Sequence, residues 1–272
     1  MGKFYDSIPS TLIPWLLKQE MFWVATAPLS LEGHVNVSPK GIRGSFHIIS
    51  PTQVWYQDLT GSGVETISHL RENGRITLLF HNFGGPPRIA RLFGTGKVHE
   101  FGSPEYEALI PLKERRPSSR AAIVIDVHKV GTSCGYAVPY YEFKAHRQVL
   151  LDCFAKCELA DQADPSAHAK HGMKAYWARN NLQSIDGLPG LVLAPAASRS
   201  PEFSDEMRRA NPPEDEFWAS RPADANGLPS GRGSKVLVKH GLERQRVQEW
   251  AVAFALGLMA AAIYVQAIDF AG

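Results

Sequence analysis

The sequence is short of several features that would assign it to a common class. Its 272 residues include only three cysteines, an odd number that argues against a disulfide framework and for a reducing compartment. No run of five or more Lys or Arg occurs, and the formal net charge of +2 gives no broad field, so we expect no nucleic-acid partner. The N-terminus, MGKFYDSIPS, lacks the apolar stretch of a secretory signal.

Metal-binding patterns are also scarce. Cys153 and Cys157 would share one face of a helix, but no further Cys or His pair stands nearby at zinc-ligand spacing, which favours packed thiols. His168 and His171 lack a third ligand, and we expect them to be solvated. The composition, 44% hydrophobic and 21% charged, is that of an ordinary globular protein with a core. We therefore predict no metal site.

Hydrophobic patterning predicts many short strands around a few short helices. The predicted strands are 22–27, 34–38, 45–50, 53–56, 76–80, 88–100 and 121–130, and the predicted helices are 9–18, 62–73, 104–110, 140–158 and 176–182. Gly94 and Gly96 interrupt the longest strand and suggest a bulge or bend. We expect Pro39-Lys40-Gly41 to end the second strand. This order is typical of a mainly β barrel with helical decorations.

The stretch Val54–Phe80, VWYQDLTGSGVETISHLRENGRITLLF, stands at the centre of this pattern. It is interpreted as strand, glycine-rich turn, helix and strand. Ser62 and Glu65 have the spacing of a capping box, so we expect Ser62 to be the N-cap. A glycine-rich turn at a helix start can hold an anion such as a phosphate. A capped surface helix that binds nothing is the alternative.

Several ordered motifs resemble one family. FWVATAPLSLEGHVNVSPKG, the central stretch, PPRIARLFGTGKVHE, TSCGY and SIDGLPG follow one another, and within residues 22–130 the order resembles the pyridoxamine 5′-phosphate oxidase-like family of FMN-binding split barrels. The resemblance is strongest to an uncharacterised fungal and bacterial branch. It implies a split β-barrel with a C-terminal helical extension, FMN as cofactor, and a homodimer that binds FMN at the subunit interface.

The resemblance also suggests which residues bind the cofactor. The candidates lie on the central turn, on a neighbouring strand and at a family arginine position: Ser38, Lys40, Arg43, Thr60, Gly61, Ser62, Thr66 and Arg91. Three departures matter. Glu65 and Thr66 align with an Arg-Lys pair of the true oxidases, Ile89 aligns with a flavin-contacting Gln, and the C-terminal Trp…Arg-Leu-x-Pro signature is absent. Pyridoxamine phosphate oxidation is therefore not expected.

Two functional classes remain open from the sequence. The first is an FMN-dependent oxidoreductase acting on a small molecule, and the second is a non-catalytic flavin- or haem-binding protein serving as sensor, scavenger or membrane-tethered adaptor. Cys134 is interpreted either as a redox-active thiol near the cleft or as a small residue packed in a tight turn. No residue is assigned a catalytic role.

The chain divides into four predicted parts: a split-barrel domain (1–160), a helical and turn extension packed on it (161–197), a flexible linker (198–235) and a C-terminal helix (236–272). Within the last part, the nineteen residues Trp250–Ile268 carry no charge, near the lower limit for a membrane span. We expect a tail anchor in an intracellular membrane with the barrel on the cytoplasmic side. A buried or dimer-packing helix is the alternative.

Overall fold

The computed structural model describes residues 2–164, 170–204 and 207. Contacts divide the chain into Met1–Glu214 and Asp215–Gly272, and every described residue belongs to the first unit. The predicted anchor Trp250–Ile268 and most of the predicted linker lie outside the described residues. Within the described ranges, no helix is long and apolar enough to cross a bilayer.

Eight strands and five α-helices follow one another along the described chain. The strands are β1 (Lys3–Tyr5), β2 (Met21–Thr26), β3 (Asn36–Gly41), β4 (Phe46–Ser50), β5 (Gln53–Leu59), β6 (Arg75–His81), β7 (Ile89–Glu100) and β8 (Ser119–Ser133). The helices are α1 (Ile13–Leu17), α2 (Glu65–Asn73), α3 (Pro104–Leu109), α4 (Val149–Ala163) and α5 (Met173–Asn180), with short 3₁₀ turns at Leu112–Glu114 and Ala194–Ala196.

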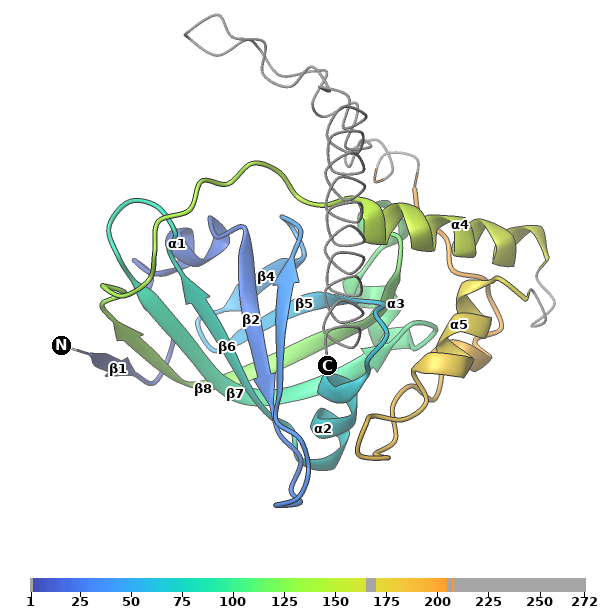
Figure 1. Ribbon diagram of the computed structural model, residues 1–272, viewed down its shortest axis with the longest axis horizontal. Coiled ribbons are helices and arrows are strands. Elements are labelled where there is room, and N and C mark those ends of the chain that lie inside the picture. The colour runs from blue at the N-terminus through green and yellow to red at the C-terminus, as the bar shows by residue number, and fades with distance from the viewer. Residues whose placement is uncertain (1, 165–169, 205–206, 208–272) are drawn as a thin grey trace, which may run out of the picture. The chain divides into compact units, whose positions relative to one another are not determined.

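All strand pairings are antiparallel, and they form one strongly curled sheet (Figure 1). The order is β3-β2-β6-β7-β8-β5-β4, with β1 pairing beside β8. The two ends of this order, β3 and β4, do not pair with each other, so the barrel is split between them. The expectation of a mainly β split barrel with helical decorations is confirmed.

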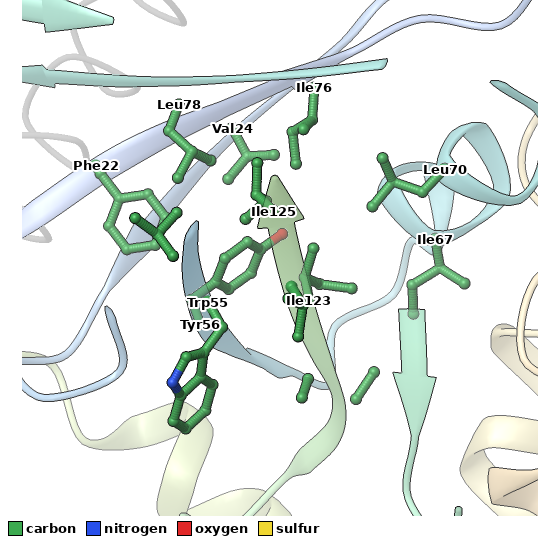
Figure 2. Close-up of a cluster of buried hydrophobic side chains, with 14 of the residues drawn as sticks. Phe22, Val24, Trp55, Tyr56, Ile67, Leu70, Ile76, Leu78, Ile123 and Ile125 are labelled. Carbon is green, nitrogen blue, oxygen red and sulfur yellow. The ribbon is translucent and has the colours of Figure 1, made fainter. Parts of the chain in front are cut away.

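The barrel interior is filled by alternate residues of its strands. In β2 the burial pattern alternates strictly, and β6 buries Ile76, Leu78 and Phe80 in the same way. Four rings from different strands meet inside, and the Phe22 centroid lies within 5.4 Å of those of Phe46, Tyr56 and Phe80. Figure 2 shows this interior together with Ile67 and Leu70, which α2 contributes to the core.

The start of α2 differs from the expected capping box. The helix begins at Glu65 with Val64 as its N-cap, and no side chain accepts a hydrogen bond there. Ser62 precedes the N-cap, and Glu65 instead accepts a hydrogen bond from the Ile185 backbone N–H at 3.3 Å. The other end fits the prediction, because Gly74 adopts the left-handed conformation with φ of 71°.

Two further boundaries differ from the predicted ones. β3 continues through Pro39-Lys40-Gly41 and pairs with β2 as far as Gly41, which an edge strand permits because its outer N–H groups need no partner. The helix expected from residue 140 begins only at Val149. Residues 135–148 instead form an extended strap over one end of the barrel (Figure 1), and Tyr141 N–H donates to the Phe83 carbonyl at 3.1 Å.

The predicted irregularity in the longest strand is present, since the β7–β8 register shifts between Phe93 and Gly94. A side chain at Gly94 would meet the Asp126 carbonyl of β8 at 2.7 Å. The bulge therefore lets the two strands approach closely while the sheet bends.

The segment after the strap packs directly on the barrel. Arg115 and Glu158 form an ion pair in which both side chains are almost fully buried, with Nη1–Oε2 and Nη2–Oε1 distances of 2.9 and 3.0 Å. Burial alone lowers the pKa of Arg115, but Tyr106 and Glu158 raise it above its usual value. A second anchor is Glu100, whose carboxylate accepts N–H bonds from residues 192–194 and pairs with Arg71.

Replacing Glu158 with Ala should lower the free energy of unfolding by about 3–5 kcal/mol, because the Arg115 charge would stay buried without its counter-charge. Urea unfolding followed by circular dichroism measures this. The matched control is Lys97→Ala, which removes an exposed ion pair with Asp126 and should cost less than about 1 kcal/mol. Equal midpoints for the two variants would contradict the role of the buried pair.

Candidate functional site

A pocket of about 430 Å³ lies beside the split of the barrel. Its walls come from the edge strand β3, the end of β5, the turn that leads into α2, and the start of β8. The lining residues are Ser38, Pro39, Lys40, Gly41, Ile42, Gln57, Leu59, Thr60, Gly61, Ser62, Gly63, Glu65, Thr66, Arg120 and Leu150. This volume falls within the range of small-ligand sites.

An ion triad lies beside this pocket, and two of its members, Lys40 and Arg120, line it. Asp58 on β5 is fully buried, and its two oxygens bind different cations. Lys40 Nζ of β3 lies 2.8 Å from Oδ1, and Arg120 Nε of β8 lies 2.8 Å from Oδ2. Arg120 also donates to the Gly63 carbonyl at 2.9 Å. The triad leaves one net positive charge beside the pocket.

The charge state of Asp58 follows from these contacts. Burial alone would raise the pKa of its carboxyl, but Lys40 and Arg120 outweigh burial and lower the pKa from 3.8 to about 2. Asp58 is therefore ionised at every physiological pH. It holds both cations in place without leaving the pocket negatively charged.

The turn between β5 and α2 is held from behind by the C-terminal extension. The Trp177 indole N–H donates to Thr60 Oγ1 at 2.8 Å, and the Thr60 hydroxyl donates to the Ser118 carbonyl at 2.7 Å. Asn181 Nδ2 donates to the Gly61 carbonyl at 3.0 Å. The turn is thus fixed by side chains far away in the sequence, and the Thr60 hydroxyl is engaged within the protein.

A chain of polar groups runs inward from the pocket wall. Ser38 Oγ donates to Asn36 Oδ1 at 3.0 Å, and Asn36 Nδ2 lies 3.0 Å from Thr66 Oγ1. Asn36 Nδ2 also donates to Thr26 Oγ1, and Thr26 Oγ1 lies 2.9 Å from His69 Nδ1. Burial lowers the pKa of His69, so this ring is neutral near pH 7. The chain fixes the orientation of Ser38 and Thr66 at the pocket.

The structure brings six of the eight predicted cofactor-binding residues to the pocket: Ser38, Lys40, Thr60, Gly61, Ser62 and Thr66. The other two do not line it. Arg43 pairs with Glu20 at the neighbouring surface. Arg91 lies near the start of β7, opposite Leu79 and Gly131 of the adjoining strands.

Sequence reasoning missed Arg120, the second cation of the triad. A basic residue directly before the predicted strand 121–130 was a signal in the sequence. However, only the pairing of Asp58 with Ala121 brings this part of β8 to the pocket. Glu65, which interrupts the family pattern, also lines the pocket, and a side chain at Gly63 would collide with its carboxylate. The three cysteines do not line the pocket. Cys134 and Cys153 are exposed, and Cys157 is half-buried.

Known proteins match the barrel and, in one case, most of the chain's length. The sequence profile of a family described as pyridoxamine 5′-phosphate oxidase matches residues 10–134. The pyridoxamine 5′-phosphate oxidase family protein ustO of Aspergillus flavus is 39% identical over 196 residues, which cover 70% of this chain and 78% of that protein. The chain belongs to the pyridoxamine 5′-phosphate oxidase family.

Solved structures give more distant likenesses. HupZ of Group A Streptococcus is 23% identical, with a TM-score of 0.37 over 45% of this chain and 92% of that chain. A Clostridium acetobutylicum protein of the pyridoxinephosphate oxidase family, related to general stress protein 26, is 14% identical, with a TM-score of 0.31 over 47% and 91% of the two chains. Membership of the pyridoxamine 5′-phosphate oxidase family therefore rests on the sequence matches.

The ion triad generates a prediction about acid stability. Because the folded pKa of Asp58 lies below the usual 3.8, its stabilisation is complete above about pH 5 and is lost as the pH falls toward 2. A shift of this size corresponds to roughly 2 kcal/mol. The difference in free energy of unfolding between the wild type and Asp58→Asn should shrink by that amount between pH 5 and pH 2.

Urea unfolding at several pH values measures this difference. Asp126→Asn is the control, because it also removes a carboxylate paired with a lysine, but an exposed one. A wild-type minus Asp58→Asn difference that stays constant down to pH 2 would show that the triad does not couple to stability.

Proposed function

We propose that this chain is an FMN-dependent oxidoreductase acting on a small molecule, with the phosphate of FMN in the pocket beside the split. The observation that carries the proposal is the convergence of Lys40, Arg120 and the start of α2 on one 430 Å³ pocket. Family membership supports the same cofactor. Pyridoxamine phosphate oxidation itself is not proposed, because the departures at Glu65, Ile89 and the C-terminal signature remain.

The residues that line the pocket are chemically suited to bind a phosphate group. Lys40 supplies a point charge and Arg120 a planar guanidinium, and both are already positioned by Asp58. The N–H groups of the first turn of α2 have no partner within the helix, so they can donate to an anion. Glu65 is the one opposing charge in the lining; its Oε1 accepts a hydrogen bond from the Ile185 N–H of the extension, while its Oε2 lies against Gly63.

When bound, FMN supplies hydride or electron transfer at its ring. The protein contributes binding and orientation. Lys40 and Arg120 neutralise the phosphate, Gly61 and Ser62 leave room on the turn, and Trp177 keeps that turn in place from behind. Since Asp58 stays ionised, the cations are held in one geometry before the cofactor arrives.

Replacing Lys40 with Ala should weaken FMN binding by about 1.5–3 kcal/mol, the range for a charge-assisted hydrogen bond. Gly61→Trp should abolish binding, because a side chain at Gly61 meets no atom within 4 Å and the indole would fill the pocket. Quenching of flavin fluorescence measures both. Lys97→Ala, an exposed lysine elsewhere, and Leu31→Trp, an indole on a fully exposed position, are the controls.

Unchanged affinity in both Lys40→Ala and Gly61→Trp would refute the pocket as the cofactor site. Flavin absorbance that bleaches under NAD(P)H would support turnover. Tight flavin binding without bleaching by any nicotinamide donor would instead favour the non-catalytic class.

We also propose a homodimer in which each FMN contacts both subunits. The supporting observation is the position of Arg91, which does not line the pocket of its own chain. In the proposed dimer, the contact of Arg91 with the cofactor comes from the second copy. Ile89 and Arg91 of β7 are half-buried, which is compatible with a surface that a second subunit covers.

Subunit complementation tests this arrangement. Arg91→Ala homodimers should bind FMN about 10- to 100-fold more weakly than the wild type, as expected for one charge-assisted contact. Gly61→Trp homodimers should not bind it. Mixed dimers should recover one tight site per dimer, since the intact pocket then faces an intact Arg91. No recovery on mixing, with dimers verified by size, would contradict a shared site.

A further inference from the structure

A second and larger recess, of about 1070 Å³, lies on the other side of the edge strand β3. It is bounded by α1 and the residues after it, by the β6–β7 turn, and by the strap. We name this recess the strap groove. Pro39 and Gly41 line both the strap groove and the cofactor pocket, so only one strand separates the two.

Aromatic rings line the strap groove. His81, Phe83 and Tyr141 form a chain with centroid distances of 4.3 and 5.2 Å, and each ring meets the next edge to face. Phe143 packs against His146 at 4.9 Å on the strap itself. Trp15 adds a further aromatic side chain from α1. Aromatic walls of this kind favour a ligand with a flat ring, which can stack on the side-chain rings or meet their edges.

The strap crosses this groove between two attachment points. Tyr141 N–H bonds to the Phe83 carbonyl, and His146 Nε2 lies 3.1 Å from both Glu20 Oε2 and the Arg43 backbone N. Between these points the Phe143 side chain is 46% exposed. The ring therefore stands at the groove with solvent on one side, where a ligand would cover it.

The charges of the groove favour an acidic ligand. Lys18, Lys144 and Arg147 line it against Glu20 and Glu142. Glu20 is already paired with Arg43 from outside the lining. Burial lowers the pKa of His81, and Trp23 N–H donates to its Nε2 at 3.0 Å, so that ring is neutral. Lys18 and Arg147 therefore stand against one further lining carboxylate, that of Glu142.

We propose that the strap groove binds planar aromatic ligands that carry an acidic group, such as an aromatic carboxylate. The ring lies among Phe83, Tyr141 and Phe143, and the acid faces Lys18 and Arg147. This site is distinct from the cofactor pocket and does not depend on flavin. Because the two recesses share β3, a ligand in the groove is a neighbour of whatever the pocket holds.

The probe is 2-naphthoate, with the uncharged 2-naphthylmethanol for comparison, and binding to the full-length protein is measured by equilibrium dialysis. One saturable naphthoate site per chain is expected. Gly84→Trp should weaken it about tenfold or more, because a side chain at Gly84 meets no atom within 4 Å and would fill the groove. Phe143→Ala, which only shortens an exposed side chain, should weaken it about three- to tenfold.

Matched variants distinguish binding in the groove from non-specific adsorption of an aromatic acid. Leu31→Trp places an indole on a fully exposed position and should leave naphthoate binding unchanged. A combined Lys18→Ala and Arg147→Ala variant should weaken naphthoate several-fold but leave 2-naphthylmethanol unaffected. Equal naphthoate affinity in the wild type, Gly84→Trp and Phe143→Ala would overturn the proposal, as would non-saturable binding.

Flavin binding supplies the independent readout. Gly84→Trp should keep FMN affinity while losing naphthoate, and Gly61→Trp should keep naphthoate while losing FMN. If neither the wild type nor any variant binds FMN, the proposed cofactor fails while the strap groove stands. If Gly61→Trp loses naphthoate with its fold intact, the two recesses are one site and the groove proposal fails.

Discussion

The contact of Asp58 with both Lys40 and Arg120 holds the two sides of the split barrel together. β3 and β4 end the sheet without pairing, so no backbone ladder joins β3 to β5 across the gap. The triad makes that connection through side chains, with oxygen–nitrogen distances of 2.8 Å on both sides. Its burial strengthens each interaction, and two of its members, Lys40 and Arg120, bring their cationic groups to the lining of the pocket. One set of contacts therefore serves both the fold and the pocket.

The extension after the strap is part of the pocket's construction. Trp177 and Asn181 bond to Thr60 and Gly61, and Gly190 approaches Asn181 and Val64 so closely that any side chain there would collide. These contacts replace the capping box that the sequence suggested for α2. The turn keeps its shape because distant residues bond to it, and the N–H groups of the first turn of α2 have no partner within the helix.

Two recesses flank the same edge strand, and their chemistry differs. The smaller pocket combines fixed cations with a helix start and suits a phosphate. The strap groove combines aromatic walls with exposed basic side chains and suits a flat acidic molecule. A ligand in either recess therefore lies next to the same edge strand as a ligand in the other. Pro39 and Gly41 carry no long side chain that would separate them.

The sequence by itself determined the local elements and the family. Alternation in β2 and β6, the turn before α2 and the bulge at Gly94 follow from residue type and spacing, because each depends on neighbours in the chain. Six of the eight site residues that the family resemblance suggested line the pocket, and they lie on the turn, at the start of α2 or on one strand beside it. Only the tertiary structure decided the rest. Arg120 joins Asp58, Trp177 reaches Thr60 and the strap covers the groove through contacts between residues some 60 to 120 positions apart, and no local pattern encodes such pairings.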